Sequence, residues 1–201
     1  MTQMSQESDL NESERLLREF FDRKTKKVAR GLLGRYLVRE INGKKMVARI
    51  IETEAYLGPH DKACHTYDFK KTKRTATMYE QPGTIYVYLI YGMYHCLNVI
   101  TEPEGMPCAV LIRQLHPVAG IEMMKENRNV KIGKNYKNLL DGPGKLCMAL
   151  DITKDKFNGT DSCDPNASLY FTRGTRAEKE KIEAKKRIGI DYAEEDKDRL
   201  L

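Results

Sequence analysis

The residues best suited to chemistry lie in the segment I-I-E-T-E-A-Y-L-G-P at residues 50–59, which holds Glu52, Glu54 and Tyr56. A carboxylate can take a proton from water, and it can stabilise the positive charge that develops on a sugar during bond cleavage. A tyrosine ring offers a flat, amphipathic surface that suits a planar ligand. The segment therefore combines a candidate catalytic group, Glu54, with a candidate stacking surface, Tyr56.

A second segment, residues 84–98, reads T-I-Y-V-Y-L-I-Y-G-M-Y-H-C-L-N in a chain without tryptophan. Its first half alternates aliphatic side chains with Tyr86 and Tyr88, which is typical of a strand with two different faces. Gly92 interrupts the pattern, so Tyr91 and Met93 are expected at or near the tip of a β-hairpin. Tyrosines at this density suggest stacking, and together with Glu54 they indicate an enzyme that acts on a nucleobase.

Chemistry on a base within duplex DNA requires the nucleotide to leave the stack. Tyr91, on a projecting turn, could enter the gap as a wedge from the minor groove. The rings of Tyr56, His65 and Tyr88 could sandwich the extruded base, and each stacking contact would contribute about 1–3 kcal/mol. A cationic alkylated purine would gain further cation–π attraction from these rings.

Hydrolysis of the glycosidic bond then needs an activated water and negative charge near the sugar, and Glu54 could supply both. Arg113 could hold the water or the carboxylate through a charge-assisted hydrogen bond. No lysine falls among the candidate pocket positions. We therefore expect direct hydrolysis, with no Schiff base and no cleavage of the DNA strand.

The composition allows this function without requiring it. The chain has 201 residues, a formal charge of +6 and a pI near 9.0, which suit one core and an anionic partner. The five cysteines show no C-x-x-C pair and no zinc-like spacing, so we expect free thiols in a reducing cytoplasm. No apolar run approaches the roughly 20 residues that cross a bilayer. We expect a cytoplasmic protein, associated with the nucleoid in a bacterium and nuclear in a eukaryote.

Local patterns predict the elements that position the candidate residues. Leu16, Leu17, Phe20 and Phe21 predict the buried stripe of a short helix, and a second helix is expected to start at Thr25 and end at Gly34. Asn42-Gly43 predicts a tight turn between strands at residues 36–41 and 45–56. Further strands are expected at residues 84–90, 94–101 and 108–115.

Two polar segments have more than one interpretation from the sequence. Residues 61–78 carry four closely spaced cations and are most simply a solvated loop; the cations are Lys70, Lys71, Lys73 and Arg74. The sequence D-G-P-G-K at residues 141–145 forces a turn before an apolar run. Its backbone amides and Lys145 could hold a phosphate, although the spacing is not that of a Walker motif.

Each candidate residue also has a structural explanation. The tyrosines could be half-buried packing residues, and Glu52 and Glu54 could be solvent-exposed charges on one strand face. His65 could be a hydrogen-bonded residue without a function, and Arg113 could neutralise an acid. Two rival classes remain open: a nucleic-acid-binding module that releases no base, and a metal-dependent nuclease that uses Glu52, Glu54, Asp61 and His65.

Five motifs favour the glycosylase hypothesis. The segments at residues 50–59, 82–94 and 96–98, together with A-V-L-I-R at 109–113 and G-P-G-K-L-C at 142–147, resemble signatures of the alkyladenine (3-methyladenine) DNA glycosylases, the type without a helix-hairpin-helix. Their order and spacing cover about three quarters of the chain, from the Leu32-Leu33-Gly34 region to Arg187-Ile188-Gly189-Ile190.

The resemblance implies a role for each matching residue. Glu54 would activate the attacking water with support from Arg113, and Tyr56, His65 and Tyr88 would line the base pocket. Asn98 would lie at the pocket floor and obstruct the amino group of guanine. Tyr91 would be the wedge, with Met93 against the distorted duplex. Gly144 stands where vertebrate relatives carry serine, so Lys145 or backbone amides would have to contact the phosphate.

The resemblance also implies an architecture and a reaction. We expect an α+β fold, a single mixed domain with a curved antiparallel sheet flanked by helices and a protruding β-hairpin. Residues 1–10 would form a frayed segment and residues 11–201 the glycosylase domain. The expected enzyme is a monomer without metal or cofactor. It would flip alkylated or deaminated purines out of double-stranded DNA and leave an abasic site, the first step of base excision repair.

Overall fold

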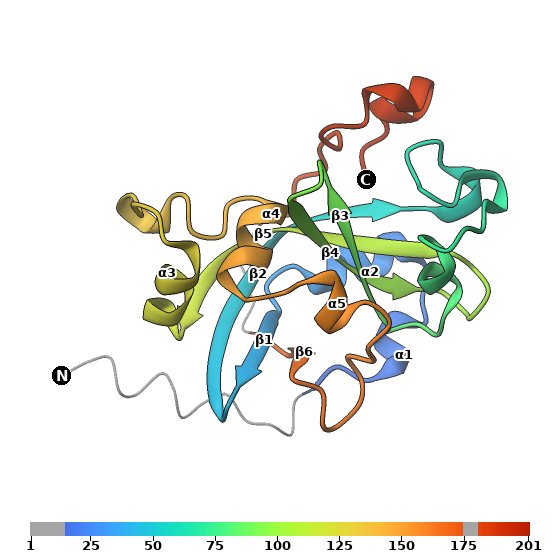
Figure 1. Ribbon diagram of the computed structural model, residues 1–201. Coiled ribbons are helices and arrows are strands. Elements are labelled where there is room, and N and C mark those ends of the chain that lie inside the picture. Colours follow the sequence, from blue (N-terminus) through green and yellow to red (C-terminus); the bar gives the residue numbers. More distant parts are fainter. Residues whose placement is uncertain (1–14, 175–180) are drawn as a thin grey trace.

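A six-stranded antiparallel sheet organises the molecule (Figure 1). The computed structural model describes residues 15–174 and 181–201, so the expected frayed segment at 1–10 lies outside the described residues. The strands follow the order β3-β4-β5-β2-β1-β6 across the sheet. They are β1 (Tyr36–Ile41), β2 (Lys44–Tyr56), β3 (Ile85–Ile90), β4 (Tyr94–Thr101), β5 (Cys108–Ala119) and β6 (Leu169–Thr172).

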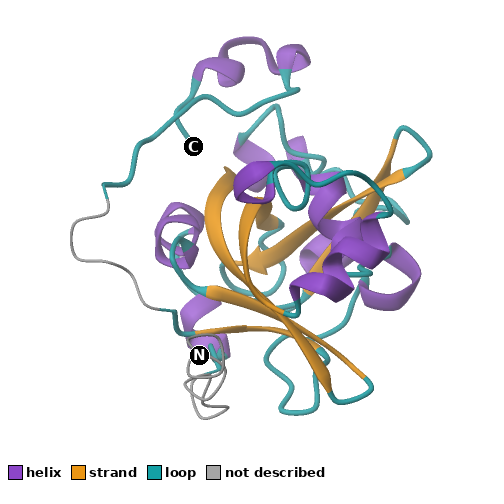
Figure 2. Cartoon of the chain, turned by 90° about the vertical axis from the view of Figure 1, so that its left-hand side faces the viewer, coloured by secondary structure: helices purple, strands orange, loops and turns teal. Residues whose placement is uncertain are grey.

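Short helices and 3-10 turns surround the sheet, which is twisted and curled in Figure 2. The α-helices are α1 (Arg18–Phe21), α2 (Thr25–Leu32), α3 (Ile121–Arg128), α4 (Pro143–Ala149) and α5 (Lys154–Phe157). The 3-10 turns are η2 (Gly58–His60), η3 (Tyr67–Phe69), η4 (Ala76–Tyr79), η5 (Lys134–Tyr136) and η6 (Asp191–Asp198). The expected α+β class and the single mixed domain with a curved sheet are confirmed.

The two faces of the sheet bury different side chains. Ile85 and Val87 of β3 belong to the main apolar core, which also includes residues of α2, α4 and α5. Tyr86 and Tyr88 point the other way and belong to a smaller cluster with Ile100 and Ala109. The predicted alternation along β3 is therefore confirmed, and the second face is the one that carries the candidate site.

Several local predictions are confirmed. Helix α2 begins at Thr25, and Gly34 just beyond its end has the expected positive φ of 83°. Asn42 and Gly43, with φ of 50° and 75°, form the predicted turn between β1 and β2. Strand β5 runs to Ala119, four residues further than expected.

The prediction for the first helix is wrong in part. Only Arg18–Phe21 is helical, and the Leu17 residue is 62% exposed rather than buried. The chain before the helix is extended, and the Leu16 amide donates to the Phe171 carbonyl of β6. Pairing with the sheet has therefore replaced the helical turn that the apolar pattern favoured.

The β3–β4 hairpin projects from the body of the molecule, as Figure 2 shows. Its tip carries Tyr91 and Gly92, which have positive φ of 53° and 70°. The protruding hairpin expected from the sequence is therefore present, with Tyr91 at its tip.

Two segments cover the tyrosine face of the sheet: residues 57–83 and the C-terminal residues 187–198. The interpretation of residues 61–78 as a solvated loop is wrong for a large part of that segment, because Asp61, Thr66 and Met78 are each at most 2% exposed. Among the described residues, no helix combines the length and apolar character needed to cross a membrane.

Candidate functional site

Strand register places the candidate site residues in one row across the sheet. Tyr86 of β3 pairs with Asn98 of β4, Asn98 pairs with Leu111 of β5, and Leu111 pairs with Glu54 of β2. Directly paired residues of an antiparallel sheet point to the same face. Glu54 and Asn98 therefore face the same side as the tyrosines, and the backbone lattice sets their spacing.

Glu54 is a buried carboxylate held by two hydrogen bonds and one ion pair. The residue is 3% exposed. Its Oε2 accepts from the Tyr56 hydroxyl at 2.8 Å, and its Oε1 accepts from the Ile188 amide at 3.2 Å and lies 3.4 Å from Arg113 Nε. Burial raises the pKa of Glu54, while the Tyr56 hydrogen bond and then the Arg113 charge act to lower it.

The simple explanation of two exposed acids on one strand is wrong for Glu54. The Glu52 side chain is 39% exposed, whereas that of Glu54 is 4% exposed. Arg113 Nε lies 3.6 Å from Glu52 Oε1 and bridges the two acids. A carboxylate accepts about four hydrogen bonds. Because Glu54 accepts two hydrogen bonds, it keeps acceptor capacity for a further partner.

Three aromatic residues expected in the pocket lie around one small cluster on this face of the sheet, and one of them, Tyr56, contacts the carboxylate. Tyr56 and Tyr88 pack against the same small cluster, which includes Cys64, Met78 and Tyr86. The His65 ring meets the Tyr88 ring edge to face, with centroids 4.7 Å apart. The structure thus brings together Glu54, Arg113, Tyr56, His65 and Tyr88.

His65 is held in its neutral form. Its Nδ1 lies 3.2 Å from the Tyr86 hydroxyl. Burial and then the nearby Arg74 charge lower the pKa of His65 to about 4. The imidazole therefore carries no charge at neutral pH.

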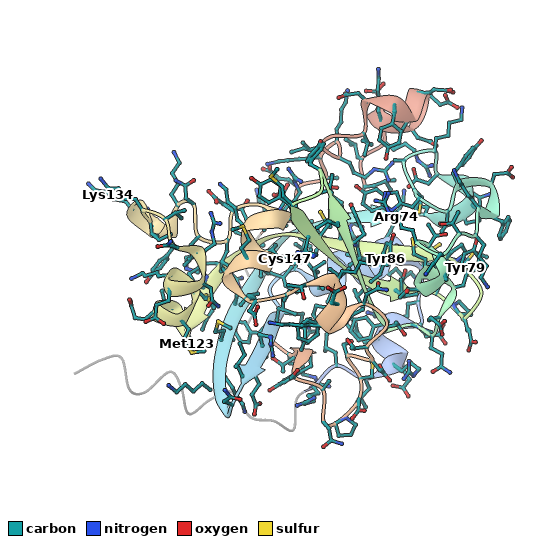
Figure 3. The ribbon with its side chains drawn as sticks, viewed as in Figure 1. Arg74, Tyr79, Tyr86, Met123, Lys134 and Cys147 are labelled. Atoms are coloured by element: carbon teal, nitrogen blue, oxygen red, sulfur yellow. The ribbon has the colours of Figure 1, made fainter. Side chains whose placement is uncertain are left out.

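Arg74 is a site residue that the sequence interpretation placed in a solvated run of cations. Its guanidinium lies over the Tyr88 ring, 5.2 Å from the centroid, and 3.5 Å from His65 Nε2. Figure 3 shows it beside Tyr86. Neither the spacing nor the charge pattern of residues 70–74 distinguishes Arg74 from its lysine neighbours, so local reasoning had no signal for it.

Asn98 is 4% exposed and pairs on the sheet with Tyr86, a member of the aromatic cluster. Its Nδ2 donates to the carbonyls of Tyr86 and Cys96 at 3.2 and 3.4 Å. These bonds fix the orientation of the side chain. The role of Asn98 at the pocket floor, which the family resemblance implies, stays a prediction.

The hairpin tip presents large side chains to solvent. Tyr91 is 82% exposed and Met93 is 64% exposed. In Figure 1 the tip and the C-terminal segment both lie at the upper end of the molecule. An exposed aromatic on a projecting turn has the shape that the wedge hypothesis requires.

Lys145 lies in α4, apart from the aromatic cluster. Its Nζ contacts Asp141 Oδ1 at 2.9 Å and Asn138 Oδ1 at 3.2 Å. The Lys145 interaction helps to hold the pKa of Asp141 below its usual range. The predicted phosphate contact would therefore compete with partners already in place. A side chain at Gly144 would meet the Tyr94 ring at 3.2 Å.

Sequence reasoning also missed a buried ion pair under the site. Arg187 donates to both carboxylate oxygens of Asp61, at 2.5 and 2.9 Å, and both side chains are 0% exposed. The two residues are 126 positions apart. Arg187 was noted only as part of the R-I-G-I motif, and Asp61 only as a possible metal ligand of a nuclease.

Two residues that the metal-dependent nuclease hypothesis needs as metal ligands, Asp61 and His65, already have other partners. Both oxygens of Asp61 are engaged by Arg187, and His65 is bonded to Tyr86. Among residues 15–174 and 181–201, no group of three or more His, Cys, Asp or Glu residues could hold a metal ion.

A cavity of about 700 Å³ borders β2 between α2 and residues 181–186. Its lining includes Lys26 and Arg30 of α2 and also Glu52 and Glu54 of β2, but none of the aromatic site residues. Within the aromatic cluster, the His65 and Tyr88 rings contact each other.

Comparison with known proteins agrees with this geometry. A sequence model of the family described as "Methylpurine-DNA glycosylase (MPG)" matches residues 19–201. A protein named "Putative 3-methyladenine DNA glycosylase" from Clostridium novyi is 48% identical over 194 residues, with 92% of each chain covered. One of the same name from Desulfitobacterium hafniense is 50% identical over 189 residues, covering 92% of this chain and 91% of the relative.

The fold, the site and these matches together define a DNA glycosylase, a hydrolase that acts on N-glycosyl bonds in DNA. More particularly, the chain belongs to the methylpurine-DNA glycosylase family. The resemblance stated from the motifs is confirmed, and the role in DNA repair follows from it.

Proposed function

We propose that this glycosylase flips alkylated or deaminated purines out of double-stranded DNA and hydrolyses their glycosidic bond with Glu54 as the general base. The observation that carries the proposal is the Glu54 carboxylate, buried and held by two hydrogen bonds and the Arg113 ion pair beside the aromatic cluster. The names of the relatives support 3-methyladenine as one substrate.

In the proposed reaction, Glu54 accepts a proton from water while the water oxygen bonds to C1′ of the sugar. The bond between C1′ and the base breaks, and its electron pair leaves with the base. The negative charge of Glu54 stabilises the positive charge that develops on the sugar. Arg113 orients the carboxylate. No lysine reaches Glu54 among the contacts of the described residues, which supports direct hydrolysis.

The pocket would hold the base between Tyr56 on one side and the His65–Tyr88 pair on the other. Both tyrosines pack against one cluster that includes Tyr86, the strand partner of Asn98, which supports Asn98 as the floor of the pocket. The neutral state of His65 adds no positive charge against a cationic alkylated base. Selectivity against guanine would come from Asn98.

The flipped state needs something to fill the gap in the duplex. Tyr91 is 82% exposed at the hairpin tip, and Met93 beside it is 64% exposed. We assign Tyr91 as the wedge, Met93 as a contact to the distorted duplex and Lys145 as a phosphate contact.

The test is single-turnover excision from duplex oligonucleotides that carry one defined lesion, with chelator present, resolving released base from cut strand. Glu54→Gln should still bind DNA and should lose about 10²–10⁴-fold in rate, the usual contribution of a general base. Glu52→Gln, on the same strand and also beside Arg113, is the matched control and should keep most of its rate. Normal excision by Glu54→Gln would refute the assigned role of Glu54, and DNA binding without excision by the wild type would favour the binding-module alternative.

A further inference from the structure

The Asp61–Arg187 pair has no assigned part in the reaction. A buried ion pair is costly unless its donors and acceptors are satisfied. The four terminal N–H groups of Arg187 have four acceptors: both oxygens of Asp61, the Ala55 carbonyl at 3.1 Å and the Asp196 carbonyl at 3.2 Å. The fifth donor, the buried Nε–H, has no partner. The guanidinium is thus a fixed junction between β2 and the C-terminal segment.

Asp61 extends the junction into the segment after β2. Its Oδ2 accepts from the Leu57 amide at 3.0 Å, and its Oδ1 accepts from the Ala63 amide at 3.1 Å. These bonds fix the bend through η2 that leads from Tyr56 toward His65. One ion pair therefore sets the path of two segments that border the site.

The junction is linked to the proposed general base, Glu54, through β2 and through the C-terminal segment. Ala55, whose carbonyl accepts from Arg187, lies between Glu54 and Tyr56 in the chain. Ile188, the residue after Arg187, donates its amide to Glu54 Oε1. The Arg187 guanidinium also lies over the Tyr56 ring, 4.9 Å from its centroid.

We infer that Arg187 and Asp61 are positioning residues for the glycosylase reaction: together they hold the Ile188 amide on Glu54 Oε1 and hold Tyr56 beside Glu54 Oε2. This inference rests on the proposed role of Glu54. Neither residue touches the reacting atoms. Their contribution is the fixed orientation of the carboxylate that accepts the proton.

The pH dependence of the reaction distinguishes a positioning role of the Asp61–Arg187 pair from a role in protein stability alone. The Ile188 and Tyr56 hydrogen bonds both lower the pKa of Glu54. If the junction loosens, these bonds weaken and the pKa of Glu54 rises further. The acid limb of the rate profile should then move to higher pH, which a loss of folded protein alone would not produce.

The first variant is Arg187→Lys, which keeps one positive charge but cannot reproduce the planar fork. We expect its single-turnover rate to fall about 10- to 100-fold, as for small errors of position, with DNA affinity unchanged and the acid limb shifted upward. Arg199→Lys is the matched control. Arg199 fastens the same segment through the His60 carbonyl and Asp196, and its variant should keep the wild-type rate and acid limb.

A second variant covers the case in which Arg187→Lys does not fold. The double change Asp61→Leu with Arg187→Met replaces both charges with apolar groups, a replacement that buried pairs often tolerate. The folded double variant should show the same slow rate and the same upward shift. Wild-type rate and acid limb in either folded variant would overturn the inference.

The outcome for Glu54→Gln keeps the two proposals distinguishable. Loss of activity in Glu54→Gln with normal kinetics in the Arg187 variants would remove the positioning role alone. Full activity in Glu54→Gln would remove the proposed general base itself, whatever the Arg187 variants do.

Discussion

Glu54 and Asn98 stand opposite the same residue, Leu111, on the two sides of β5. Two strand spacings, about 10 Å in all, therefore separate the backbone of the proposed base from that of the proposed pocket floor. Hydrogen-bonded strands deform less readily than loops. The distance between the reacting end and the recognition end of the pocket is thus a property of the sheet.

The Tyr56 hydroxyl should tune the proposed general base. Tyr56→Phe removes the 2.8 Å hydrogen bond to Glu54 Oε2, the largest influence that lowers the pKa of Glu54. A hydrogen bond to a charged group contributes about 1.5–3 kcal/mol, so the acid limb should move up by about one to two pH units. The measurement is single-turnover rate against pH.

Tyr192→Phe is the control for this shift, because the Tyr192 hydroxyl donates to the Ala63 carbonyl and not to Glu54. It should leave the acid limb in place. An unshifted limb in Tyr56→Phe would contradict the role given to the hydroxyl.

Folding stability should respond to pH in the opposite sense to activity. Burial raises the pKa of Glu54 in the folded state, so between its unfolded and folded values the folded protein binds more protons. Stability must then fall as pH rises through that window, whereas activity rises because the carboxylate ionises. Glu54→Gln lacks the titrating carboxyl group. In urea unfolding, its free energy of unfolding relative to that of the wild type should therefore increase as pH increases. A difference that is constant with pH would argue against a raised pKa.

Arg74 should keep His65 neutral. Its charge is the second cause, after burial, that lowers the His65 pKa to about 4. Arg74→Met should therefore raise the His65 pKa, short of the ordinary value because the burial effect remains. The imidazole NMR signals followed against pH would report this change. Lys73→Met, one residue away and exposed, should leave the titration unchanged, and an equal shift in both variants would point to general charge rather than to contact.

Tyr91 should act on DNA and not on stability. With 82% of the residue exposed, Tyr91→Ala should change the free energy of unfolding by less than about 0.5 kcal/mol. Loss of a stacking contact of about 1–3 kcal/mol should slow excision from duplex DNA by roughly 5- to 150-fold. The same lesion in single-stranded DNA needs no wedge, so its excision should change little. Equal losses on both substrates would contradict the wedge assignment.

Sequence alone predicted the features that depend on neighbouring residues. The Asn42-Gly43 turn, the end of α2 at Gly34 and the Tyr91 hairpin tip each follow from backbone preferences within a few positions. The roles expected for Glu54 and Arg113 also followed from the resemblance of the motifs to a known family. The structure brings these two residues together.

What the sequence could not predict depends on distant contacts. Leu17 became exposed because the chain before α1 pairs with β6. Arg74 looked like one of four loop cations until its guanidinium was seen over Tyr88. Asp61 and Arg187 are ordinary charges in sequence, and only the fold brings them together across 126 positions.

That separation also bears on when the enzyme becomes active during its own synthesis. The strands that carry Glu54, Tyr88 and Asn98 are complete by residue 101, but the Ile188 amide reaches Glu54 across 134 positions. Long-range contacts form late in folding because the intervening chain must first be closed into a loop. A nascent chain could therefore hold a formed sheet and still lack a finished site, so glycosylase activity would begin only after the last part of the chain has been made and has docked.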